Sequence, residues 1–241
     1  MNEEKNAQNL DKAIAESFLA DPGSIDISKY RFLSDPAAEI LASFGGYLFL
    51  DGLAELSDAT AESLSKYQGS RLSLSGLTHI SDGGLHLLSR AAEELNLSSL
   101  SEISEKNFKA LIQNRESLSL GIRELNDRQA EVLELYHGSE LFLNELCELS
   151  DTALDAISGL KLNRLSLTGL RNISSALAER LASISRRTNL LLPGSPHITK
   201  PALQKLFAED SNEWPDQEIE LCGNISLPDY ECVLTDSILN E

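Results

Sequence analysis

Pairs of leucines separated by one residue recur along the chain at a nearly constant interval. Successive pairs begin 24, 23, 23, 23, 24 and 25 residues apart. The first leucines are Leu48, Leu72, Leu95, Leu118, Leu141, Leu165 and Leu190, and a second leucine follows two positions after each. Because residues i and i+2 of a strand point to the same side, each pair predicts a short strand with one buried face.

The segment that follows each pair has the features of a loop and a helix. In the stretch RLSLSGLTHISDGGLHLLSR (71–90), Ser81 can cap a helix by accepting a backbone N–H, and Asp82 suits the first helical turn. Leu85 and Leu88 then recur at helical spacing. Each unit is therefore predicted to be a strand, a loop and a short helix.

A single unit of this kind cannot bury both its strand leucines and the apolar face of its helix. Stacked units would join their leucines into one continuous core and their strands into a parallel sheet. Because helices are wider than strands, we expect the stack to curve with the sheet on its concave side. The sequence thus predicts an α/β fold built from repeats.

The segment LSLSGLTHISDGGL (72–85) resembles a leucine-rich repeat. It is most similar to the cysteine-containing subtype, L-x-L-x-x-C-x-x-I-T-D-x-x-L, with Leu77 standing where that subtype carries cysteine or asparagine. The resemblance covers about residues 25–207. It implies a leucine-rich-repeat solenoid, a horseshoe with a concave parallel sheet and short convex helices.

The ends of the chain are predicted to close this stack. We expect an N-terminal capping helix within residues 1–23, a solenoid of about eight units over 24–208, and a C-terminal cap over 209–241. In the N-terminal segment, Leu10, Ile14 and Phe18 fall on one face of a helix drawn over residues 4–19.

Weaker copies of the strand pattern lie next to these caps. Ile25 and Ile27 are expected to form the strand of a first unit, and residues 219–221 are expected to form a last one. Trp214 is interpreted as packing within the C-terminal cap.

The charge of the chain restricts its partners. A net charge of −18, with a sequence pI of about 4.6, argues against nucleic acid and against an anionic membrane surface. The acidity either keeps a long surface soluble or steers a basic partner. The N-terminus lacks the features of a signal peptide, so we expect a cytoplasmic protein.

Candidate chemistry is sparse. The three cysteines, Cys147, Cys222 and Cys232, do not suggest a disulfide framework, although Cys222 and Cys232 could pair if the chain is exported. The four histidines occupy different positions in separate units, and no known catalytic or metal-binding motif is present. We expect no enzymatic activity, no metal and no cofactor.

The residues that alternate with the strand leucines are the candidates for binding. Most are small and polar, but two groups of larger side chains interrupt them. The predicted partner-binding residues are Tyr47, Phe49, Asp51, Arg71, Ser73, Glu94, Asn96, Glu140, Phe142, Asn144 and Arg164. Exposed aromatic residues often anchor interfaces; alternatively, the small residues allow curvature and the aromatic rings cover the sheet.

We therefore expect a module that binds a protein or peptide, possibly a basic one, on its concave face. An acidic inhibitor that sequesters a basic enzyme is the first alternative, and a structural or assembly module is the second. The sequence favours a monomer but leaves the oligomeric state open.

Overall fold

Strands and helices alternate throughout the fold. The computed structural model describes residues 8–113, 115–193, 200–206 and 219–222. Eight strands of these residues form one parallel sheet in the order β10-β9-β8-β7-β6-β5-β4-β3. They are β3 (Leu48–Phe49), β4 (Arg71–Ser73), β5 (Glu94–Leu97), β6 (Ser117–Leu120), β7 (Glu140–Phe142), β8 (Arg164–Ser166), β9 (Asn189–Pro193) and β10 (Ile219–Cys222). The predicted α/β fold with a parallel sheet is confirmed.

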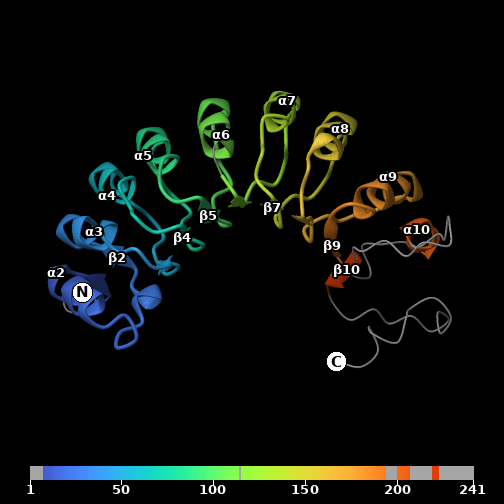
Figure 1. Ribbon diagram of the computed structural model, residues 1–241. Coiled ribbons are helices and arrows are strands. Elements are labelled where there is room, and N and C mark those ends of the chain that lie inside the picture. Colours follow the sequence, from blue (N-terminus) through green and yellow to red (C-terminus); the bar gives the residue numbers. More distant parts are fainter. Residues whose placement is uncertain (1–7, 114, 194–199, 207–218, 223–241) are drawn as a thin grey trace.

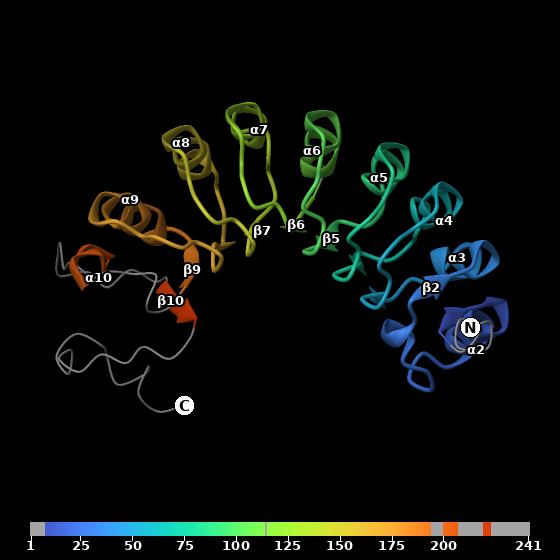
Figure 2. The same cartoon turned by 180° about the vertical axis from the view of Figure 1, so that it is seen from behind.

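The helices lie in a row beside one another along this sheet. They are α2 (Lys12–Ala20), α3 (Asp35–Ala42), α4 (Asp58–Leu64), α5 (Asp82–Leu88), α6 (Glu105–Ile112), α7 (Asp127–Leu133), α8 (Asp151–Gly159), α9 (Ser175–Ser185) and α10 (Lys200–Leu206). The chain follows an arc with the strands on its inner side and the helices on its outer side (Figures 1 and 2). The sheet therefore lines the concave surface.

The first leucines of the successive pairs stand side by side in the sheet. Leu48 pairs with Leu72, Leu72 with Leu95, Leu95 with Leu118, and the same register continues to β10. The first leucines of the five pairs from Leu48 to Leu141 are between 0% and 2% exposed. Together with the apolar faces of the helices they form one hydrophobic cluster that runs the length of the described fold. Each coil therefore completes the core of its neighbour.

The Ser-Asp motif connects the coils in addition to capping the helices. As predicted, Ser81 accepts a hydrogen bond from the backbone N–H of Gly84, at 2.9 Å. Its hydroxyl also donates to Asp58 in the preceding coil, at 2.5 Å. The same inter-coil bond joins Ser57 to Asp35 at 3.3 Å and Ser104 to Asp82 at 3.0 Å. The acidic residue therefore stabilises the start of its own helix and also bonds to the N-cap serine of the helix in the next coil.

The helix expected over residues 4–19 is shorter than predicted. It begins at Lys12, with Asp11 as its N-cap, and Leu10 lies in a two-residue strand, β1 (Asn9–Leu10). This strand pairs in parallel with β2 (Phe32–Leu33). Leu10 and Asp11 stand 23 residues before Leu33 and Ser34, so the N-terminal segment repeats the second half of a unit in register.

The strand expected at Ile25 and Ile27 is also absent. Ile27 begins a short 3-10 helix, η1 (Ile27–Lys29), whose N-cap Asp26 accepts hydrogen bonds from the backbone and the hydroxyl of Ser28. This side chain–backbone bonding competes with strand pairing. In the described residues the large sheet therefore ends at β3, while the expected last strand at 219–221 lies within β10.

Glycine allows the coils to approach one another closely after each strand. A Cβ atom at Gly76 would overlap the backbone carbonyl of Asp51, and Gly52, Gly121 and Gly169 have the same relation to the coil before them. By contrast, a Cβ atom at Gly159 would meet no atom within 4 Å. The spacing between coils, rather than the backbone conformation, thus requires the glycine.

We expect Gly76→Ala to lower the free energy of unfolding by about 1–3 kcal/mol, as overpacking typically does. The control Gly159→Ala should be neutral or stabilising by about 0.5–1 kcal/mol, because alanine is the better helix former. Urea denaturation followed by circular dichroism measures both. Equal effects of the two substitutions would contradict the role given to Gly76.

Candidate functional site

The most exposed large apolar side chains of the concave surface lie at its N-terminal end. Phe49 in β3 is 43% exposed, and Tyr47 immediately before β3 is 56% exposed. The strand leucines on either side of Phe49, Leu48 and Leu50, are fully buried. The alternation of the strand therefore places these rings on the surface, as predicted for both residues.

Arg71 joins this aromatic pair to the neighbouring strands. Its guanidinium lies 4.9 Å from the centroid of the Tyr47 ring. The same group donates through two nitrogens to one carboxylate oxygen of Glu94, with Nη2–Oε2 and Nε–Oε2 distances of 2.5 and 2.6 Å. These two charge-assisted hydrogen bonds hold the arginine side chain in one direction. Tyr47, Arg71 and Glu94 thus form one ordered group across β3, β4 and β5.

A second aromatic–arginine pair lies on β7 and β8. The guanidinium of Arg164 is 5.9 Å from the centroid of the Phe142 ring, and Phe142 is half-buried. Arg164 is the register neighbour of Glu140. Phe49 and Phe142 are separated by four strand steps, which corresponds to roughly 19 Å at about 4.8 Å per step.

Four of the predicted binding residues have structural roles. Ser73 is only 4% exposed, so the expectation that it is accessible is wrong. Its hydroxyl donates to Asp51 Oδ1 at 2.5 Å and accepts from the Asn96 amide at 3.2 Å. Asp51 also accepts the backbone N–H of Ser75, at 3.0 Å. This hydrogen-bonded row links three consecutive coils.

Asn144 repeats this arrangement at the other end of the face. Its Oδ1 accepts a hydrogen bond from the hydroxyl of Ser166 at 2.5 Å, and Ser166 is buried. The small polar residues of the concave face therefore satisfy one another between coils. The aromatic and charged residues remain as the accessible part of the predicted site.

Two carboxylates at the starts of the central strands were not among the predicted binding residues, because only one position before each leucine pair was considered. Glu93 precedes β5, Glu116 precedes β6, and both are exposed. Glu116 Oε1 accepts from the hydroxyl of Ser139 at 2.5 Å. The signal was present in the sequence, since both glutamates stand two residues before a first leucine.

Two buried tyrosines hold this edge of the sheet together. The hydroxyl of Tyr67 donates to the backbone carbonyls of Gly46 and Arg71, and that of Tyr136 is within hydrogen-bond distance of the carbonyls of Glu116 and Glu140. Burial raises the pKa of Tyr67 to about 12. The pKa of Tyr136 is also raised, first by burial and then by the charges of Glu116 and Glu140.

A buried arginine lies behind the same edge. Arg115 donates to the backbone carbonyl of Leu88, the last residue of α5, and to those of Ala91 and Ala92 just after it. Its Nε donates to the carbonyl of Leu111 at 3.3 Å. Cations are favoured at helix C-termini. Burial lowers the pKa of Arg115 to about 10. Because its donors are committed to backbone oxygens, we assign Arg115 a structural role.

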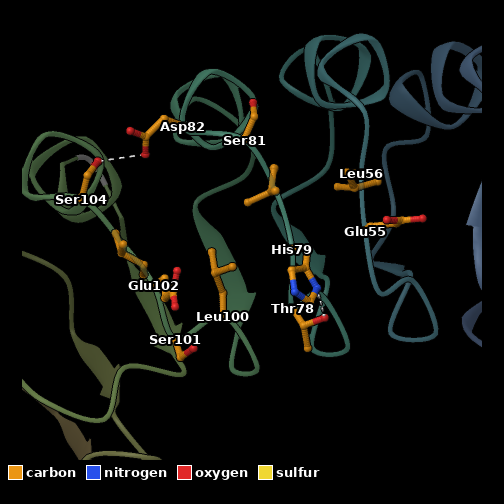
Figure 3. Close-up of a pocket in the computed structure, with 12 residues that line it drawn as sticks. Glu55, Leu56, Thr78, His79, Ser81, Asp82, Leu100, Ser101, Glu102 and Ser104 are labelled. Atoms are coloured by element: carbon orange, nitrogen blue, oxygen red, sulfur yellow. Dashed lines mark hydrogen bonds between the residues drawn. The ribbon is translucent and has the colours of Figure 1, made fainter.

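A shallow groove of about 830 Å³ runs across the loops that lead from the strands to α4, α5 and α6. Figure 3 shows Glu55, His79 and Glu102 in three adjacent loops along this groove. All three are exposed, and the half-buried Ile80 also lines the groove. This groove is therefore predominantly acidic.

Metal-binding groups do not gather in the part of the chain that the structure describes: no cluster of three or more histidine, cysteine or acidic side chains there could hold an ion. His79 Nδ1 lies 2.9 Å from the hydroxyl of Thr78, and Cys147 is a half-buried free thiol. Within the described residues, no helix is long and apolar enough to cross a membrane. Trp214 and Cys232 lie outside the described residues.

Comparisons with known proteins add no family to this picture. No protein-family model matches the chain, and no curated protein shows significant similarity to it.

We expect Asp51→Ala to lower the free energy of unfolding by about 1–3 kcal/mol, because it leaves the buried Ser73 hydroxyl and the Ser75 N–H without their acceptor. Asp51→Asn keeps an acceptor oxygen and should cost less than half as much. Urea denaturation of the two variants measures this difference. Equal losses would show that the charge of Asp51, and not its hydrogen bonds, is what matters.

Proposed function

We propose that this chain is a leucine-rich-repeat solenoid whose concave sheet binds a protein or peptide. The horseshoe architecture is supported by the in-register leucine columns and by the alternation of one strand and one helix per unit. Such solenoids offer long concave surfaces for recognition. The module acts by binding, without chemistry of its own.

The observation that carries this proposal is the exposure of Tyr47 and Phe49 on the concave face of the sheet. Small polar residues elsewhere on the face bond to one another between coils. The aromatic rings take no part in these hydrogen-bonded rows, and burying a large aromatic side chain supplies much of the energy of an interface. A partner that covers them gains apolar contact without breaking the polar rows.

We expect the double variant Phe49→Ala/Phe142→Ala to weaken partner binding at least tenfold, because interface anchors cost about 2 kcal/mol or more when truncated. The partner would be captured from native lysate with the wild-type chain and identified by mass spectrometry. Its affinity for each variant would then be measured by titration.

Leu135→Ala is the matched control. Leu135 is 47% exposed, close to the value for Phe49, but it follows helix α7 and lies outside the sheet. We expect this variant to bind as the wild type does. A similar loss of affinity in the control and the double variant would contradict docking on the concave face.

A second candidate is an acidic protein that sequesters a basic enzyme, supported by the net charge and by the acidic groove on the loop side. For this function, Glu55→Gln/Glu102→Gln should weaken binding about fivefold at low salt, and the effect should fade at 0.5 M salt because exposed charges are screened. Titrations at the two salt concentrations test this. If the concave variant fails to bind and the groove variant binds normally, the second candidate is rejected.

A further inference from the structure

The centre of the concave face is acidic along its strand-start edge. The segments 93–98, 116–121 and 139–144, which contain β5, β6 and β7, hold four glutamates and neither lysine nor arginine. These glutamates, named here the central carboxylates, are Glu93, Glu94, Glu116 and Glu140. The nearest strand cations, Arg71 and Arg164, stand on β4 and β8, outside the three central strands.

Most of the negative charge of the central carboxylates is not neutralised. Glu94 pairs with Arg71. Glu116 and Glu140 bind the hydroxyls of Ser139 and Ser117, at 2.5 and 3.2 Å, and a hydroxyl carries no compensating charge. Their field reaches the Tyr136 hydroxyl, where they help to raise its pKa. Three of the four carboxylates therefore form no ion pair among the described residues, although Arg164 is the register neighbour of Glu140.

Aromatic side chains lie at both ends of this stretch of the face, with Phe142 on the same strand as Glu140. Tyr47 and Phe49 lie on the β3 side and Phe142 lies on the β7 side. Over the roughly 19 Å between the two phenylalanines, the face presents first the Arg71–Glu94 pair and then the carboxylates at the starts of β5, β6 and β7. A partner that buries the aromatic rings must also place some group over the carboxylates, and an apolar or acidic group there would be unfavourable.

We infer that the occupant of the concave face is a basic polypeptide segment with lysine or arginine between two large apolar side chains. The inference rests on the proposed function and adds the chemistry of the partner. Charge complementarity disfavours a second copy of this chain, which also carries −18. The two apolar side chains would be separated by about six residues in an extended segment, or by about 13 in a helix.

The test is a selection from phage-displayed random 16-residue peptides on the immobilised full chain. We expect enriched peptides to carry a basic residue between two leucine or aromatic residues at one of these separations. Synthetic copies should bind Glu93→Gln/Glu140→Gln about five- to tenfold more weakly than the wild type, the loss expected for two exposed charge pairs. Circular dichroism and urea denaturation would establish that the variant is folded.

A matched variant controls for net charge. Glu39→Gln/Glu131→Gln removes the same two charges from exposed positions of α3 and α7, and the peptides should bind it within twofold of the wild type. Equal losses in the two charge variants would overturn the inference, because the attraction would then depend on total charge.

The selection also separates this inference from the proposed function. If the peptides lose affinity for Phe49→Ala/Phe142→Ala but not for Glu93→Gln/Glu140→Gln, the concave face binds and the basic partner is wrong. If they bind both variants as tightly as the wild type, the concave site itself is rejected. Enrichment of peptides without a central basic residue, or of no peptide, would also overturn the inference.

Discussion

The structure depends on the burial of one coil's leucines against those of the next. A strand of two to five residues cannot hold a sheet by itself, but Leu72, Leu95 and Leu118 lie in register and are almost completely buried. Burying each such side chain contributes roughly 1.5–3 kcal/mol. This contribution exists only when the neighbouring coil is present, so the stability of any unit is shared with the units on either side.

The same register decides what the polar residues do. Equivalent positions of adjacent coils are brought one strand spacing apart, so side chains at the same or nearby positions of neighbouring coils can bond to one another. Ser73 bonds to Asp51 and Asn96 in this way, and Ser81 bonds to Asp58. A residue that cannot join such a row stays on the surface. Phe49 is the clearest example, and the proposed binding site consists of these exceptions.

Much of the fold could be predicted from local patterns. The strands, their parallel order and the helix caps follow from the leucine spacing and from residues such as Ser81. The prediction for the N-terminal segment was wrong because Leu10 and Phe18 also fit helical spacing, whereas the structure places Leu10 in a strand. The strand predicted at Ile27 does not form because the Asp26 side chain accepts a hydrogen bond from the local backbone. Local spacing did not reveal either competing interaction.

The sequence by itself determined which side chains point inward, because strand and helix periodicities are properties of the local backbone. It also determined the net charge, and with it the kinds of partner that are disfavoured. Only the tertiary structure decided which outward side chains are accessible, since Ser73 and Phe49 hold the same position in their coils but differ in burial. That difference arises from neighbours about 23 residues away in the chain, whose side chains either bond to a residue or leave it exposed.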